Sequence, residues 1–260
     1  MSRRSLSVFT GLCALVFSAL CAMPLGAQTA EVKEKPAMYS YVANWQIPRA
    51  HWADMEKSTA SRNEILDKAL ADGTIVGYGD DMNLVHTPDG ETHDNWWAAM
   101  SMAGLVKVLD RFFAADISAS PNSASPTKHW DNIYVSRYYN WKSGAYKGGY
   151  VHVGVYKLKT DAPDNAVDSL SKHMVAPFLE KMLADGTIVE YEIDNMVVHT
   201  EAPGMFAIVY ITPTADGLDT VHAALVDSMK SNPLLGHAFG SMVDDSGHRD
   251  ELLKGNGIFK

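Results

Sequence analysis

Two histidines, His86 and His93, flank the turn sequence PDGE and form the first candidate for chemistry. A hairpin folded around PDGE would place the two imidazoles opposite each other, and cross-strand neighbours lie about 5 Å apart. Imidazoles at that distance can bind one metal ion, with Asp89 or Asp94 as a further ligand. The alternative interpretation is structural, since a histidine at a strand end often hydrogen-bonds the backbone.

His222 is another candidate, because a helical pattern places it on an apolar face. The other members of that face are Leu218, Val221, Leu225 and Met229. A histidine buried there needs a hydrogen-bond partner or a function such as metal or haem ligation. The alternative is a core histidine whose hydrogen bonds are satisfied.

Tryptophan is distributed unevenly along the chain. All six tryptophans lie within the first 141 residues: Trp45, Trp52, Trp96, Trp97, Trp130 and Trp141. Such an aromatic load indicates a pocket for a flat or apolar ligand, with Trp45, Trp96 and Trp97 as its candidate walls. The alternative is that the larger rings only fill the core of this part of the chain.

Arg137 and Tyr138 stand in the segment SRYYNWKSG, which aligns with HRDELLKGN near the C-terminus. An arginine beside aromatic rings can clamp an anionic aromatic ligand. Because Arg249 stands at the matching position, the alternative is that each arginine forms an ion pair at the edge of its own sheet.

Composition excludes several classes of function. The chain carries a net charge of −9 and has no long basic run, which disfavours nucleic acid and anionic lipid as partners. The sequence contains no serine nucleophile elbow, phosphate-binding glycine loop, dinucleotide fingerprint or zinc helix motif. We therefore expect no cofactor.

A long internal repeat organises these candidates. The heptapeptide LADGTIV occurs at residues 70–76 and 183–189, 113 positions apart. The match extends over residues 66–87 and 179–200, where 14 of 22 positions are identical. A period above 100 residues is too long for a solenoid unit and has the size of a small domain. The chain is thus a duplication.

Each copy reads as strand, helix, strand, strand, helix, strand. In the first copy we expect strands at residues 38–47, 74–87, 95–103 and 132–139, with helices at 52–70 and 104–116. In the second we expect strands at residues 150–159, 187–200, 205–213 and within 237–245, with helices at 165–183 and 215–229. This order is that of a ferredoxin-like unit, whose sheet has helices on one face only. Apolar residues on both faces of the third strands favour two α+β units packed sheet to sheet as one α/β barrel.

On these features the chain resembles the dimeric α/β-barrel superfamily in a tandem, fused form, and in particular exported stress-responsive barrel proteins and antibiotic-biosynthesis monooxygenases. The resemblance implies small-molecule binding, with cofactor-free oxygenase or isomerase chemistry in some relatives. Haem-degrading members ligate haem with a helix histidine, near a first-strand asparagine and a third-strand tryptophan. Here Asn44 and Trp96 or Trp97 lie in the first copy, whereas His222 lies in the second, so the resemblance does not assemble that set.

The N-terminus resembles a secretory signal peptide, with Arg3 and Arg4 before an apolar stretch and Ala27 before the expected cut. Cleavage would remove both cysteines, Cys13 and Cys21, and leave no thiol for disulfides or catalysis. We expect an exported protein, periplasmic or secreted, with no contact to the membrane after cleavage.

The predicted organisation is a signal peptide at 1–27, a linker at 28–37, a Trp-rich repeat at 38–145 and a second repeat at 146–260. The favoured function is binding of a small aromatic or apolar molecule in the first repeat. Its candidate residues are Asn44, Trp45, His86, Trp96, Trp97, Arg137 and Tyr138. The alternatives are a non-enzymatic structural or stress-response module, and haem or metal binding through His86, His93 or His222.

Overall fold

The computed structural model describes residues 32–117, 126–198, 200 and 202–260. The predicted signal peptide, the start of the linker and most of the Ser/Pro-rich loop before residue 128 lie outside these ranges. Within the described residues, no helix has the length and apolar character needed to cross a membrane.

The first repeat has the predicted element order. It comprises β1 (Met38–Gln46), a short 3-10 turn, α1 (Trp52–Ala71), β2 (Gly77–Asn83), β3 (His93–Ala99), α2 (Met102–Ala114) and β4 (Lys128–Trp141). The amphipathic helix α2 begins at Ser101, whose side chain accepts a hydrogen bond from the Gly104 N–H at 3.2 Å. A serine at this position is a preferred helix start because it satisfies a free backbone donor.

The second repeat has the same order with two additions. It comprises β5 (Gly144–Leu158), α3 (Ala166–Leu170), a π-turn at Ser171–Val175, α4 (Ala176–Asp185), β6 (Glu190–Val198), β7 (Met205–Thr212), α5 (Ala215–Ser231), α6 (Pro233–Met242) and β8 (Val243–Phe259). The π-turn lies just before Pro177, which has no N–H to continue the helical ladder.

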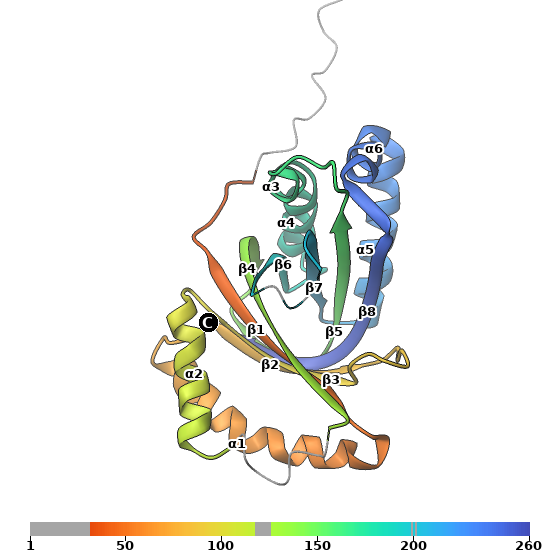
Figure 1. Ribbon diagram of the computed structural model, residues 1–260. Coiled ribbons are helices and arrows are strands. Elements are labelled where there is room, and N and C mark those ends of the chain that lie inside the picture. The colour runs from red at the N-terminus through yellow and green to blue at the C-terminus, as the bar shows by residue number, and fades with distance from the viewer. Residues whose placement is uncertain (1–31, 118–125, 199, 201) are drawn as a thin grey trace, which may run out of the picture.

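The eight strands form one closed antiparallel barrel in the order β1-β3-β2-β8-β5-β7-β6-β4. Each repeat contributes four neighbouring strands, in the order β4-β1-β3-β2 and β8-β5-β7-β6. Two junctions close the barrel, β2 against β8 and β4 against β6. The predicted fold class is confirmed: two ferredoxin-like units face each other and join at both edges (Figure 1).

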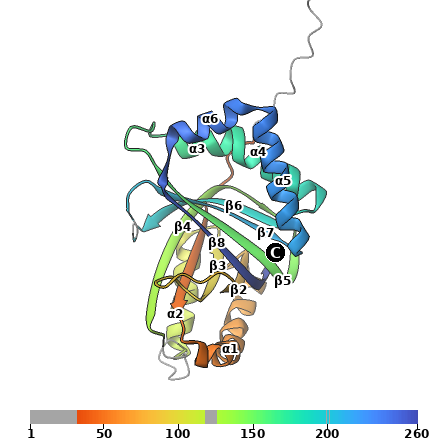
Figure 2. The ribbon, with the colours of Figure 1, turned by 90° about the vertical axis from the view of Figure 1, so that its right-hand side faces the viewer.

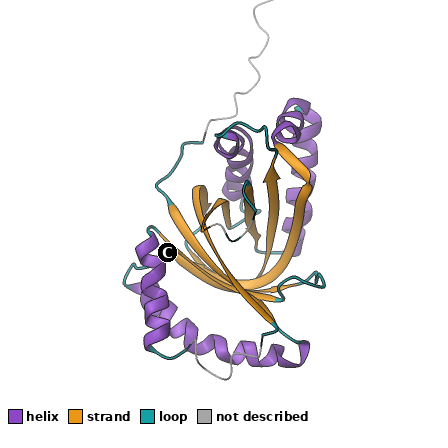
Figure 3. Ribbon diagram, viewed as in Figure 1, coloured by secondary structure: helices purple, strands orange, loops and turns teal. Residues whose placement is uncertain are grey.

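Helices cover the outside of the barrel on two opposite sides. Helices α1 and α2 lie on one side and α3 to α6 on the other, with the strands between them (Figures 2 and 3). One apolar core lies beneath α1 and α2 around Trp97 and Leu105, and another lies beneath α4 and α5 around Leu179 and Tyr191. A third apolar cluster, which includes Leu253 and Phe259, lies inside the barrel.

Two predicted details of the strands were wrong. His86 does not lie opposite His93, because β3 pairs Met82 with His93 and β2 ends at Asn83. After that point the chain turns to β8, where the Leu84 N–H donates to Leu252 O at 2.8 Å. The last strand also does not lie across residues 237–245: residues 233–242 form α6, with Pro233 in the first turn where proline is favoured, and the strand begins at Val243.

Candidate functional site

The interior of the barrel contains a cavity of about 90 Å³, measured as the space open to the centre of a water molecule. One water needs roughly 10–15 Å³ on this measure, so the cavity has room for several waters or one small organic molecule. Eight-stranded barrels have an interior of this size, which either fills with side chains or holds one small ligand.

The walls of the cavity come from both repeats. The first repeat supplies Met38, Ser40, Val42, Asn44, Asp81, Asp94, Trp96, Ala98 and Tyr134. The second supplies Val151, Val153, Glu190, Glu192, Asp194, Ala207, Val209, Ile211, Glu251, Leu253 and Phe259. About half of these side chains are aliphatic or aromatic, and six carry carboxyl groups. The cavity therefore combines an apolar lining with concentrated acidity.

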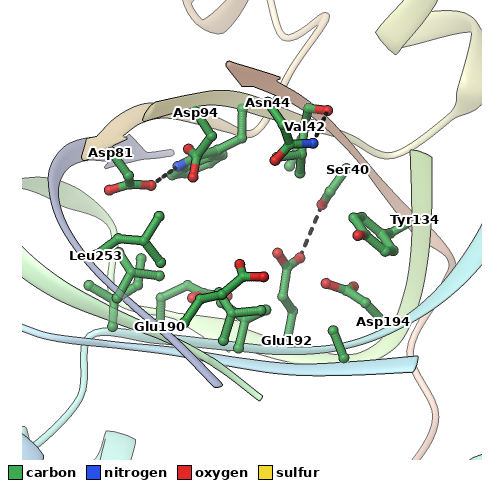
Figure 4. A pocket seen from close by; sticks show the side chains of 18 of the residues that line it. Ser40, Val42, Asn44, Asp81, Asp94, Tyr134, Glu190, Glu192, Asp194 and Leu253 are labelled. Atoms are coloured by element: carbon green, nitrogen blue, oxygen red, sulfur yellow. Dashed lines mark hydrogen bonds between the residues drawn. The ribbon is translucent and has the colours of Figure 1, made fainter. Parts of the chain in front are cut away.

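The carboxyl groups lie on facing walls, as Figure 4 shows for Asp81 and Asp94 on one side and Glu190, Glu192 and Asp194 on the other. Strand geometry explains why Glu190, Glu192 and Asp194 share one wall. Residues two apart point to the same face of a strand, and these three alternate along β6. The cavity-lining residues named above include no lysine, arginine or histidine.

Few hydrogen bonds satisfy these acids. Trp96 Nε1 donates to Asp81 Oδ2 at 3.0 Å, and Ser40 Oγ donates to Glu192 Oε2 at 3.0 Å. The Oδ1 atoms of Asp81, Asp94 and Asp194 are buried and receive no hydrogen bond from an N–H or hydroxyl donor within the described part of the chain, although Asp81 with Asp94 and Glu192 with Asp194 are close enough to share a proton. A buried polar atom is normally paired with protein, water or ligand, so these oxygens are acceptors available to a bound molecule.

Burial in the first repeat's wall favours the uncharged form of its acids. Burial raises the pKa of Asp81 to about 7, and the negative charge of Asp80 adds to the rise. Burial also raises the pKa of Asp94 well above its usual value, with a further contribution from Asp81. Both groups thus resist ionisation because an isolated charge inside the barrel is poorly solvated.

The second repeat's wall behaves in the same way. Burial raises the pKa of Glu192 to about 7. It raises the pKa values of Glu190 and Asp194 well above their usual range, and in both cases Glu192 adds a repulsive contribution. On β8, burial and the neighbouring Glu91 raise the pKa of Glu251 to about 7. At neutral pH several of these carboxyls are therefore close to half-protonated.

Two of the seven predicted ligand-binding residues line the cavity, Asn44 and Trp96. Asn44 Nδ2 donates to Asn132 Oδ1 at 2.8 Å, which holds its side chain in place. Trp97 points to the opposite face of β3 and stacks on Tyr41 beneath the helices, with ring centroids 4.2 Å apart. Neighbouring residues of a strand alternate between faces, so the two adjacent tryptophans had to separate.

The other predicted residues lie outside the barrel interior. Trp45 stacks on His129 with ring centroids 3.7 Å apart, and Tyr138 lies in the core beneath α4, where its hydroxyl donates to Asp168 at 2.6 Å. Arg137 is exposed and forms an ion pair at 2.7 Å with Glu34, which precedes β1. The structure does not bring the seven residues into one pocket.

The three histidine candidates do not form one site. His86 and His93 both contact the ring of Trp52, at centroid distances of 5.4 Å and 5.2 Å, and burial together with His86 lowers the pKa of His93 to about 4. The prediction that His222 lies on a core face was wrong, because His222 is exposed on α5, across the barrel from α1. No set of three or more His, Cys, Asp or Glu side chains is grouped to hold a metal ion within the described ranges.

Five of the six cavity carboxyls escaped the sequence predictions, and the sixth, Asp94, was predicted only as a possible metal ligand beside His86 and His93. A signal for three of the six was present, because EYEIDN places three acids at alternate positions of a strand expected to be buried on both faces. The duplication offers a second signal, since Asp81 and Asp194 occupy equivalent positions of the two copies. Both residues line the cavity and both have a buried, unpaired Oδ1.

Solved structures share this architecture over most of their length. A proposed monooxygenase from Fusobacterium nucleatum superposes with a TM-score of 0.63 at 9% identity, covering 87% of this chain and 94% of that one. A proposed monooxygenase from Lactobacillus acidophilus gives 0.60 at 11% identity, covering 84% and 94%. The chain has the α/β-barrel fold of these structures, with both ferredoxin-like units in one chain.

The chain resembles other solved structures in fold. An anthrone oxidase-like protein superposes with a TM-score of 0.51 at 8% identity, covering 85% of this chain and 92% of that one. No protein-family model and no curated protein sequence matches the chain. Activity must therefore be argued from the cavity itself.

Proposed function

We propose that the protein binds a small organic molecule in the cavity inside its barrel. The observation that carries this proposal is a cavity of about 90 Å³ between the two repeats, with apolar walls and unpaired carboxyl oxygens. A pocket with a mainly apolar lining and a few polar groups is typical of ligand sites. The names of the structural neighbours, monooxygenase and anthrone oxidase-like, support a small organic ligand.

The proposed site lies between the two repeats, whereas the sequence predicted a site within the Trp-rich repeat. Both repeats line the cavity, and Trp96 is the tryptophan that lines it. Trp97 lies in the helix-covered core, and Trp141 stacks on Phe259 with ring centroids 5.7 Å apart. The alternative that larger rings fill the core thus accounts for Trp97, while Trp96 belongs to the proposed site.

Filling the cavity tests the proposal. Ala207 lies on β7 with its side chain in the cavity wall, so Ala207→Leu would occupy part of the ligand space. We expect native mass spectrometry to show a retained small molecule, or fluorescence titration to show saturable quenching of Trp96, in the parent protein and not in this variant. Ala114→Leu on the exposed face of α2 is the matched control and should bind like the parent. Equal binding by both variants would place the ligand elsewhere.

A second candidate function is catalysis by proton transfer without a cofactor. The observation that favours it is the pKa of about 7 for Asp81, Glu192 and Glu251, because a general base works best when its pKa lies near the operating pH. Removing a proton from a bound carbon acid would permit isomerisation, or activation of the ligand toward oxygen. The test is hydrogen–deuterium exchange into a bound molecule in D2O, followed by NMR. Exchange that persists in both Asp81→Asn and Glu192→Gln would rule out Asp81 and Glu192 as the base.

We also propose that the protein is exported, on the strength of the basic and apolar N-terminal sequence alone. Expression of residues 1–260 and of residues 28–260 with a C-terminal tag, followed by cell fractionation, tests this. The full chain should appear outside the cytoplasm with its first 27 residues removed, and the shortened chain should stay in the cytoplasm. Retention of the full chain in the cytoplasm would contradict export.

A further inference from the structure

We propose that the ligand of the barrel cavity is an organic cation, a protonated amine carried on a small apolar or aromatic body. This inference rests on the proposed function, binding inside the barrel, and adds the chemical class of the ligand. It is carried by the charge of the walls, by the unpaired oxygens and by the way the two repeats differ at equivalent positions.

The charge of the walls selects for a cation. Carboxyl groups reach the cavity from four strands: Asp81 from β2, Asp94 from β3, Glu190, Glu192 and Asp194 from β6, and Glu251 from β8. The cavity-lining residues include no basic side chain, and Arg249, from outside this set, contacts Glu251 Oε1 at 3.2 Å. An anionic ligand would meet these acids as like charges or would have to hold them protonated, and either disfavours its binding. A cation would supply the missing counter-charge.

The unpaired oxygens need a donor. Buried Oδ1 atoms of Asp81, Asp94 and Asp194 receive no N–H or hydroxyl donor in the described structure, and Asp94 and Asp194 are only 8% and 2% exposed. An ammonium group has three N–H donors and no acceptor, so one such group can satisfy acceptors on more than one side chain. Charge-assisted bonds of this kind are about twice as strong as neutral ones.

The two repeats carry different side chains at one equivalent cross-strand pair of the cavity wall. In the first repeat Gly79 pairs with Trp96 across β2 and β3, and the glycine is required because an added Cβ would lie 2.7 Å from the Trp96 ring. In the second repeat the matching cross-strand pair is Glu192 with Val209. The first wall thus presents an aromatic ring where the second presents a carboxyl group.

Trp96 and the aliphatic residues give the cavity an apolar part beside the acids of both walls, which suits a molecule with two ends. The body of the ligand can pack against Trp96 and the valines of β5, while the ammonium group meets the acids of β6. Aromatic rings also attract cations directly, most strongly tryptophan. The acids are spread along two walls rather than around one point, which fits an extended organic cation better than a bare ion.

Calorimetric titration with molecules that differ only in charge tests the inference. Benzylamine, benzyl alcohol and benzoate share one body, and butylamine, butanol and butyrate share another. At pH 8 we expect each amine to bind at least about tenfold more tightly than its alcohol, and each carboxylate to bind most weakly. Asp194→Asn should lower amine affinity about tenfold and leave alcohol affinity unchanged. Asp110→Asn on the exposed surface of α2, with the same change in net charge, should alter neither.

The outcomes separate the two proposals. Alcohols that bind as tightly as the amines, or carboxylates that bind best, would overturn the cation while leaving the cavity as a ligand site. Amine binding that survives Asp194→Asn unchanged would also overturn it. If no member of either series binds to the parent protein or competes with a retained ligand, the proposed function itself fails. Thermal unfolding of both variants in the absence of ligand confirms that they are folded.

Discussion

At the scale of the residue, the repeated heptapeptide LADGTIV encodes a turn. Asp72 Oδ1 accepts from the Thr74 backbone N–H at 2.9 Å and from the Thr74 hydroxyl at 2.5 Å. Asp185 accepts from Thr187 in the same way, at 3.0 Å and 2.6 Å. These hydrogen bonds lower the pKa of both aspartates. The motif was kept in both copies because it ends a helix and begins a strand through local bonds.

The glycine of this turn is open to a direct test. Gly73 and Gly186 have φ angles of +77° and +87°, a region that side chains with a Cβ disfavour. We expect Gly73→Ala to lower the free energy of unfolding by about 1 kcal/mol, although a Cβ there would meet no atom within 4 Å. Gly236→Ala in α6 is the control, since it also meets nothing within 4 Å and should raise stability by about 0.5–1 kcal/mol. Urea unfolding measures both; a similar change in the two variants would refute the backbone explanation.

A second pair of equivalent contacts links α1 and α4 to the sheets of their own repeats. Tyr78 Oη donates to Asp67 at 2.5 Å, and its equivalent Tyr191 donates to Glu180 at 2.7 Å. Both acids lie on the helix that precedes the turn, so the same contact fastens helix and strand in each repeat. Similarity between the copies reports local structural needs at these positions, whereas the shared Asp81 and Asp194 line the cavity.

At the scale of the element, β4 and β8 hold the two repeats together. Each pairs on one side with its own repeat and on the other with the opposite one. Both are long, 14 and 17 residues, because they must span both sheets. The predicted strands covered residues 132–139 of β4 and, of β8, only residues 243–245, since the pairings that extend both strands involve residues distant in sequence.

The junction of β4 with β6 depends on one serine. The register shifts between Ser136 and Tyr138, and Ser136 Oγ accepts from the Ile193 N–H at 3.2 Å within this irregularity. Because Ser136 is 1% exposed, Ser136→Ala should leave a buried donor unpaired and cost about 1–3 kcal/mol of unfolding free energy. Ser231→Ala at the exposed end of α5 should change it by less than about 0.5 kcal/mol. Chemical denaturation of the two variants compares them, and equal stabilities would mean that the bulge is held by other bonds.

At the scale of the whole molecule, acidity in the barrel couples stability to pH. The folded-state pKa values of Asp81, Glu192 and Glu251 are raised to about 7, whereas in the unfolded chain these groups titrate near 4. The folded protein therefore binds more protons between those values, and stability is lost as the pH rises through about 7. The aspartates with lowered pKa act only at lower pH, whereas His93 and His152, whose pKa values burial lowers, oppose this trend below about pH 6.5.

Thermal unfolding between pH 5.5 and pH 8.5 checks this coupling. We expect the melting temperature to fall by roughly 5–10 °C across that interval. The double variant Asp81→Asn, Glu192→Gln removes two of the titrating groups, so its melting temperature should depend less on pH and exceed that of the parent at pH 8.5. A parent melting temperature that stays level or rises with pH would show that the interior carboxyls are solvated or already neutralised.

The duplication, the order of elements and the barrel class followed from the sequence, because they depend on local turns, on hydrophobic periodicity and on the near-identity of residues 66–87 and 179–200. Of the three tryptophans predicted to line a pocket, Trp45, Trp96 and Trp97, Trp96 lines the cavity. Tertiary structure alone decided which side of each strand faces inward, that His222 is exposed, and that acids from β2, β3, β6 and β8 meet in one cavity. The physical reason is closure: strand pairs such as Asp81 with Gly255 and Ser136 with Asp194 set the register of the barrel from residues far apart in the chain, and no local pattern encodes that register.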